Sequence, residues 1–163
     1  MWVTPSAAAS RAMASEFDYS RYGFDGREFY KWSETEVTAV QLQYEQLLGN
    51  APFWLEPRMG GKYSLRAYGD GRYVDRGMMA ANIEQRVTVL DTKMDGISTQ
   101  FEAGPFFGLG SVFDNPNRMA ARYERPVYGF DVRAVARPQV VGSIDVGIGN
   151  EGVAVFMDIN YSF

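Results

Sequence analysis

The chain ends in Val153-Ala154-Val155-Phe156-Met157-Asp158-Ile159-Asn160-Tyr161-Ser162-Phe163, where apolar residues alternate with mostly polar ones. Successive side chains of a β-strand point to opposite faces, so this pattern predicts a strand with one apolar and one mostly polar face. When tilted, such a strand is about long enough to cross a bilayer. The closing strand of an outer-membrane barrel has this build, with lipid on the apolar side and an aromatic residue at the membrane boundary. The last strand of a soluble β-sandwich would alternate in the same way, so both architectures stay open on this segment alone.

The composition favours a β-protein without a transmembrane helix. The 163 residues are 46% hydrophobic and 15% aromatic, and their mean hydropathy is -0.25. The sequence lacks the run of about 18 apolar residues that a membrane-spanning helix needs. A barrel remains compatible with these values, because lumen-facing residues dilute the apolar ones. The length fits a single domain over residues 1–163, with room for a sizeable core or a small barrel.

Charge and residue types narrow the function classes. A net charge of -4 and a pI near 4.9 argue against nucleic acid as a partner. The chain has no Cys and no His, which removes disulfides, thiolate metal sites, the commonest metal ligand and the usual general base. We therefore expect no enzymatic activity, no cofactor and no metal site.

Alternating segments recur along the chain. They cover residues 13–22, 37–48, 79–90, 97–103, 128–137 and 140–149, together with a short piece near 63–68 and the closing segment. The expected fold is all-β, an antiparallel transmembrane β-barrel with about eight strands in this chain. The polar faces of these segments carry charges of both signs that suit pairing across a lumen: Glu45, Glu84, Arg86, Glu102, Asp131, Arg133, Asp145 and Asp158.

The expected connections are of two lengths. Residues 91–96 and 150–152 are short and turn-like, whereas 23–36, 49–77 and 113–127 are long and rich in Gly, Asn, Pro and charge. Short turns at one end and long loops at the other are typical of outer-membrane barrels. A lipocalin-like soluble barrel that binds an apolar ligand also alternates, but its apolar face points inward. The sequence alone does not say which face is outside.

The longest connection contains an ordered motif. A Gly60-Gly61 pair precedes Leu65-Arg66-Ala67-Tyr68, and Gly71-Arg72-Tyr73-Val74-Asp75-Arg76 follows. The generic interpretation is flexible turns with solvated arginines. The string as a whole resembles the sixth extracellular loop of the BamA/TamA superfamily of outer-membrane assembly and translocation barrels. Two later segments, 82–86 and 100–104, resemble the strands that follow this loop, and Ile159, Tyr161 and Phe163 match the family's terminal assembly signal.

The resemblance implies specific roles within the loop over residues 49–77. It implies that the loop folds inward, that Gly60, Gly61, Leu65, Ala67 and Tyr68 form its docking motif, and that Arg66 pairs with Glu102 in the lumen. A guanidinium in a partly dehydrated lumen needs such a carboxylate, which it can hold with two hydrogen bonds. Ala67 stands where the family has glycine, and Glu102 where it has aspartate.

The family resemblance also implies a location and partners. These are a bacterial-type outer membrane, outer-membrane lipid and nascent outer-membrane proteins as substrates for insertion or translocation. Family barrels have sixteen strands and upstream POTRA domains, so this chain has the length of the carboxyl-terminal half of such a barrel. Open strand edges are costly in lipid, so the chain would then continue a longer polypeptide with an upstream POTRA-type segment or pair with a second chain. The alternative is a small closed structural or ligand-binding outer-membrane barrel without assembly activity.

Overall fold

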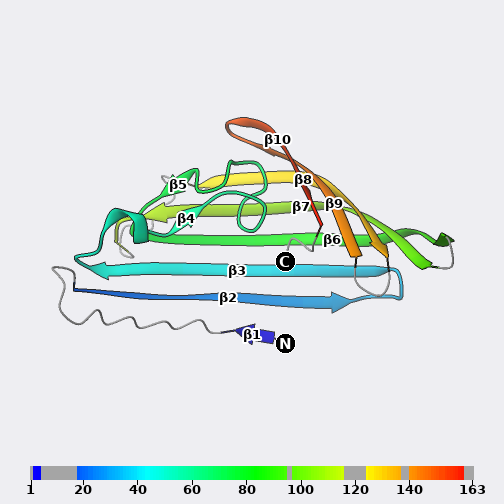
Figure 1. Ribbon diagram of the computed structural model, residues 1–163, viewed down its shortest axis with the longest axis horizontal. Coiled ribbons are helices and arrows are strands. Elements are labelled where there is room, and N and C mark those ends of the chain that lie inside the picture. Colours follow the sequence, from blue (N-terminus) through cyan, green and yellow to red (C-terminus); the bar gives the residue numbers. More distant parts are fainter. Residues whose placement is uncertain (1, 5–17, 95–96, 116–123, 137–139, 160–163) are drawn as a thin grey trace.

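The computed structural model describes residues 2–4, 18–94, 97–115, 124–136 and 140–159. Within them the protein is all-β and its main sheet is antiparallel, which confirms this part of the expected fold. The sheet has eight strands in the order β1-β2-β3-β6-β7-β8-β9-β10 (Figure 1). Their bounds are β1 Trp2–Thr4, β2 Tyr19–Lys31, β3 Glu36–Gly49, β6 Gly77–Met94, β7 Ile97–Phe113, β8 Arg125–Ala136, β9 Val140–Gly149 and β10 Gly152–Asp158.

The sheet is curved and open. Figure 1 shows β2 and β3 along its lower side and the β9–β10 hairpin arching away at its upper side. Each strand pairs only with its neighbours in the sheet order, so no ladder among the described residues joins β10 to β1 or β2. A closed small barrel, which the sequence left open, is therefore not observed in the part of the chain that the structure describes.

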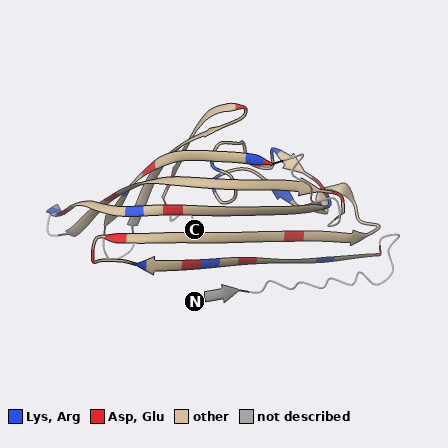
Figure 2. Cartoon of the chain, turned by 180° about the vertical axis from the view of Figure 1, so that it is seen from behind, with Lys and Arg blue, Asp and Glu red and all other residues tan. Residues whose placement is uncertain are grey.

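The two faces of the sheet differ sharply in chemistry. A row of directly paired residues on the outer face consists of Val40, Ile83, Phe107, Tyr128, Ile148 and Val153. The adjacent row on the inner face consists of Ala39, Glu84, Phe106, Gly129, Gly147 and Ala154. Large apolar side chains are exposed all over the outer face, for example 75% of Met157, and Figure 2 shows long stretches without charge along the strands. A soluble barrel has the opposite arrangement, with its apolar face inside.

The connections are longer at one end of the sheet than at the other. Residues 50–76 and 114–124 join strands at one end, and residues 32–35, 95–96 and 137–139 join them at the other. The short β9–β10 turn, residues 150–151, lies at the same end as the two long connections.

Two sequence expectations about these segments were wrong. The predicted long connection over residues 23–36 is mostly strand, because β2 continues to Lys31 and pairs with β3 along its whole length. Asp25 in this segment binds Arg27 of the same strand at 2.6 Å and accepts from Gln41 of β3 at 3.1 Å. Residues 63–68 are not a strand of the sheet, since they lie in the 50–76 loop with a single bridge from Gly61 to Leu65.

The apolar core lies between the 50–76 loop and the inner face of the sheet. It consists of Met59, Leu65, Ala67 and Tyr68 from the loop, and Met78, Phe106 and Val127 from the strands. Burial of apolar area is the main favourable term in folding, so this core fixes the loop on the sheet.

None of the helices among the described residues has the length and hydrophobicity required to cross a membrane.

Candidate functional site: the docked loop and its ion network

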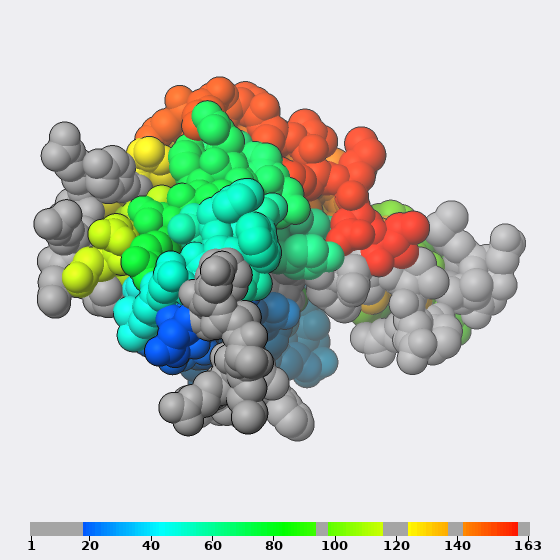
Figure 3. Space-filling view, turned by 60° about the vertical axis from the view of Figure 1, so that its left-hand side comes forward, coloured from blue at the N-terminus to red at the C-terminus, as the bar shows by residue number. Residues whose placement is uncertain are grey.

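Residues 50–76, hereafter the long loop, form the centre of the site. The loop contains the 3-10 helix η1 (Phe53–Leu55) and the short strands β4 (Arg58–Met59) and β5 (Tyr73–Val74). Pairing of β4 with β5 brings both limbs of the loop together, so that residues 60–72 make a closed excursion over the inner face. Viewed towards the end that carries it, the loop lies between β3, in cyan, and the orange to red β9–β10 hairpin (Figure 3).

Gly60 and Gly61 turn the chain at the start of this excursion. Their φ angles are 123° and 80°, in a region that residues with a side chain rarely adopt. The Gly61 N–H donates to the carbonyl of Tyr68 at 2.8 Å, and the Ser64 hydroxyl donates to the carbonyl of Gly60 at 2.7 Å. These bonds close a compact turn that presents Leu65, Arg66 and Tyr68 to the sheet.

Leu65 and Tyr68 anchor the turn on the strands. Both are almost completely buried. The Tyr68 hydroxyl donates to the carbonyl of Pro126 at 3.0 Å and accepts from the backbone N–H of Asn150 at 3.1 Å. Gly147 makes the close approach possible, because a methyl group at that position would overlap the carbonyl oxygen of Arg66. The loop backbone therefore rests directly on β9.

Arg66 reaches the middle of the inner face. Its side chain is 1% exposed, and its Nη1 lies 2.7 Å from Glu84 Oε2 and 3.0 Å from Asp145 Oδ1. Its Cζ lies 3.8 Å from the centre of the Phe106 ring, a cation–π contact. Glu84 is on β6 and Asp145 on β9, which would be about 14 Å apart on a flat sheet. One nitrogen can touch both carboxylates only because the curved sheet makes their side chains converge above Phe106.

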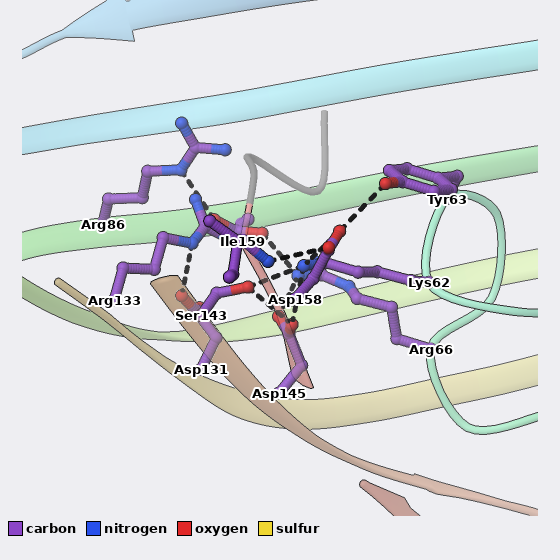
Figure 4. Close-up of polar contacts among 11 residues, drawn as sticks. Lys62, Tyr63, Arg66, Arg86, Asp131, Arg133, Ser143, Asp145, Asp158 and Ile159 are labelled. Atoms are coloured by element: carbon purple, nitrogen blue, oxygen red, sulfur yellow. Dashed lines mark hydrogen bonds and ion pairs between the residues drawn. The ribbon is translucent and has the colours of Figure 1, made fainter. Parts of the chain in front are cut away.

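A wider network of buried charges surrounds this contact (Figure 4). Glu84 also binds Arg86 Nε at 2.6 Å and pairs with Arg133, which binds Asp131 at 3.0 Å. Buried charges destabilise a protein unless they are paired and hydrogen-bonded, so this group is stable only as a set.

The loop supplies a positive charge that the sheet lacks. Asp131 and Asp145 lie directly opposite each other in the β8–β9 ladder, a like-charge pairing that is unfavourable by itself. With Glu84, the strands contribute three buried carboxylates but only two guanidinium groups, those of Arg86 and Arg133. Arg66 supplies a third guanidinium for these three carboxylates.

Lys62 and Tyr63 extend the network to the edge strand β10. The Lys62 ammonium lies 3.2 Å from Asp158 and 3.8 Å from Asp145, and it donates to the Ser143 hydroxyl at 2.6 Å. The Tyr63 hydroxyl donates to Asp158 at 2.9 Å. Figure 4 shows both side chains pointing from the loop towards Asp158.

The predicted ion pair between Arg66 and Glu102 was wrong. Arg66 forms its ion pairs with Glu84 and Asp145, whereas Glu102 lies opposite Thr88 and Arg133 in the ladders of β7. Glu102 is four residues from Phe106 along β7, which is about 13 Å. The loop docks at the level of Phe106, so its arginine does not reach Glu102.

The structure brings the predicted docking motif together but leaves part of the terminal signal undescribed. Gly60, Gly61, Leu65, Ala67 and Tyr68 all lie in the docked turn. Ile159 follows β10 and is 78% exposed, while Tyr161 and Phe163 lie outside the described residues.

Sequence reasoning did not identify the true partners of Arg66, nor Lys62 as a site residue. Glu84 and Asp145 stand on the polar faces of alternating segments, which is the signal that marks them as lumen-facing. Their proximity depends on the register of four strands, which the alternation of the sequence does not contain.

Among the described residues, no group of His, Cys, Asp or Glu is arranged to hold a metal ion. Comparisons with protein-family models, curated proteins and solved structures gave no match to this chain.

Proposed function

We propose that this chain is a membrane-embedded β-barrel unit of the BamA/TamA type that serves the insertion or translocation of outer-membrane proteins. The observation that carries the proposal is the combination of an apolar outer face with a loop arginine anchored among buried carboxylates on the inner face. The outer membrane, its lipid and nascent outer-membrane proteins would be its surroundings and partners.

The outer face supports placement in lipid. Exposed apolar side chains continue across β6 to β10 without a charged residue in the paired row from Ile83 to Val153. An apolar surface of this extent is unfavourable in water and favourable against acyl chains. The two long connections, residues 50–76 and 114–124, share one end, as the long loops of outer-membrane barrels do, although the short turn at residues 150–151 lies at the same end.

The edge of the sheet supports a role in strand insertion. β10 pairs with β9 along its length, and among the described residues nothing pairs with its other side. A free strand edge presents a row of backbone donors and acceptors that can template an incoming strand. In the proposed mechanism, a nascent outer-membrane protein adds its strand to this edge, and the work is done by backbone pairing rather than by chemical catalysis.

The membrane placement is tested with a matched pair of substitutions on β3. Leu42 lies on the outer face and Gln43 on the inner face, where its amide donates to Asp25 at 3.3 Å. Leu42→Lys should lower the free energy of unfolding in lipid by about 2–4 kcal/mol, because a cation then faces the acyl chains. Gln43→Lys should cost far less, because the new cation meets the Asp25 carboxylate. Equal small costs for both variants, or a protein that stays monomeric and folded in plain buffer, would contradict the lipid-facing assignment.

The assembly activity is tested in vesicles of outer-membrane phospholipid that contain the protein. An unfolded outer-membrane protein is added, and its folding is followed by protease protection. We expect faster folding than in empty vesicles, and a loss of this acceleration with Arg66→Ala. A wild-type protein that inserts but does not accelerate folding would favour the alternative function, a structural or ligand-binding barrel.

A further inference from the structure

The long loop contacts the β9–β10 hairpin at two separate points. At the β9–β10 turn, Arg72 Nε donates to Glu151 Oε2 and the Tyr73 hydroxyl donates to Glu151 Oε1, both at 2.8 Å. At the far end of β10, the Tyr63 hydroxyl and the Lys62 ammonium bind Asp158 at 2.9 and 3.2 Å. Asp158 is seven positions after Glu151, which is about 23 Å along a strand.

The two contact points come from opposite limbs of one loop. Lys62 and Tyr63 stand before the buried turn that carries Arg66, and Arg72 and Tyr73 stand after it. The loop therefore spans β10 from one end to the other, while the Arg66 turn between its limbs is fixed to β6 and β9. A displacement of the loop would change both contacts with the hairpin at once.

β10 depends on these contacts more than the other long strands do. It is seven residues long, and among the described residues it pairs only with β9. An edge strand held by one ladder has low local stability, and a few side-chain contacts then decide how often it opens. Since the contacts at Glu151 are exposed, they are weak individually and can be broken without unfolding the sheet.

We infer that the long loop is a two-point clasp that holds the edge strand β10 in place through Glu151 and Asp158, so that release of the loop frees β10 to exchange its pairing. The clasp itself follows from the contacts. Its regulatory consequence rests on the proposed function, because only strand templating gives the β10 edge a role. The long loop contacts β10 only when it is docked on the inner face. Docking of the loop and opening of β10 are therefore linked equilibria, and a change in one changes the other.

Backbone amide hydrogen exchange of the protein in micelles tests the clasp. The double variant Tyr63→Phe/Arg72→Gln removes one hydrogen bond at each contact point and keeps the buried turn. Amides of residues 152–158 should exchange about three- to tenfold faster than in the wild type, the size expected for the loss of two largely exposed contacts. Exchange in β6 and β7 should not change.

A control variant removes a comparable exposed pair elsewhere. Lys31 and Glu34 form an ion pair of 2.8 Å in the turn after β2, away from the loop. Glu34→Gln should leave exchange in β10 at the wild-type rate. The clasp is overturned if the double variant behaves like this control, or if exchange rises equally in all strands.

A reversible cross-link separates the clasp from the proposed function. The chain has no Cys, so Tyr63→Cys/Asp158→Cys creates a unique thiol pair for a short cleavable bifunctional reagent. The cross-link should slow exchange in β10 and abolish the acceleration of substrate folding, and cleavage should restore both. Full activity of the cross-linked protein would overturn the regulatory role. A wild-type protein that does not accelerate substrate folding would instead defeat the proposed function, and the exchange rates would still decide whether the clasp exists.

Discussion

The inner face of the sheet has two halves that both carry arginine–carboxylate ion pairs, but the long loop covers only one of them. Under the long loop, Arg66, Glu84, Arg133 and Asp145 form ion pairs with at most 1% of each side chain exposed. Next to the loop, on β2 and β3, Arg21 pairs with Glu45 while 40% and 23% of their side chains stay exposed. A hollow of about 380 Å³ opens beside this second pair.

The difference between these halves shows what the loop adds to the sheet. Without a cover, arginine–carboxylate pairs on neighbouring strands are ordinary surface ion pairs, which contribute about 0–1 kcal/mol. The loop excludes water from the ion pairs beneath it. Removal of one charged partner would therefore leave the other as an unpaired buried charge, which is strongly destabilising. Both halves of the inner face carry arginine and carboxylate residues, and only the half that the long loop buries forms the site.

The largest expected effect compares Arg66 with Arg21. Arg66→Ala leaves Glu84 and Asp145 short of a cation in a buried setting, and it should lower the free energy of unfolding by about 3–5 kcal/mol. Arg21→Ala should cost only about 0–1 kcal/mol, because water can solvate Glu45. Urea titration in micelles measures both values.

Two further variants sharpen this comparison. The double variant Arg66→Ala/Glu84→Gln should be little worse than Arg66→Ala alone, since coupled residues are not additive. Arg66→Lys keeps the charge and loses the guanidinium geometry, so an intermediate cost is expected. Equal costs for Arg66→Ala and Arg21→Ala would mean that the loop is not docked in solution.

A smaller effect is expected from a methyl group beneath the loop. Gly147→Ala places a Cβ against the carbonyl oxygen of Arg66, and it should cost about 1–3 kcal/mol as overpacking. Gly142 lies on the same strand, where an added Cβ would meet no other atom within 4 Å, so Gly142→Ala is the matched control and should be close to neutral. Limited proteolysis should cut the long loop faster in Gly147→Ala only. Equal cleavage of the two variants would show that the loop tolerates displacement from β9.

The sequence predicts the fold class better than the site. Strict alternation and an apolar face are local properties, so an all-β antiparallel sheet follows from segments such as residues 153–159. The ion pairs of Arg66 are not local, because they depend on the registers that place Glu84, Phe106, Gly129 and Gly147 in one row. The resemblance pointed to Arg66 but to a carboxylate on β7, whereas the partners of Arg66 stand on β6 and β9, because a motif does not contain the curvature of the sheet that makes these side chains converge. Residues 23–31 were mistaken for a loop because of their charges, and the contacts of Asp25 with Gln41 and Gln43 of β3 cannot be recognised before the pairing of β2 with β3 is known.

The smallest expected effect is a pH dependence at the exposed rim of the loop. Hydrogen bonds from Arg72 and then Tyr73 hold the pKa of Glu151 below its ordinary value of 4.5. A depressed carboxyl pKa means that the contact stabilises the folded state above pH 4.5 and is lost as the pH falls through the lower folded pKa.

Burial and the hydrogen bond to Glu151 raise the pKa of Tyr73 to about 12, so the Tyr73 hydroxyl keeps donating well above neutral pH. The melting temperature of wild type should therefore exceed that of Glu151→Gln by a small, constant margin between about pH 6 and 8, and the margin should vanish in acid. It should also shrink in high salt, because the pair is solvent-exposed. A margin that persists below the folded pKa would show that Glu151 acts through packing rather than through its charge.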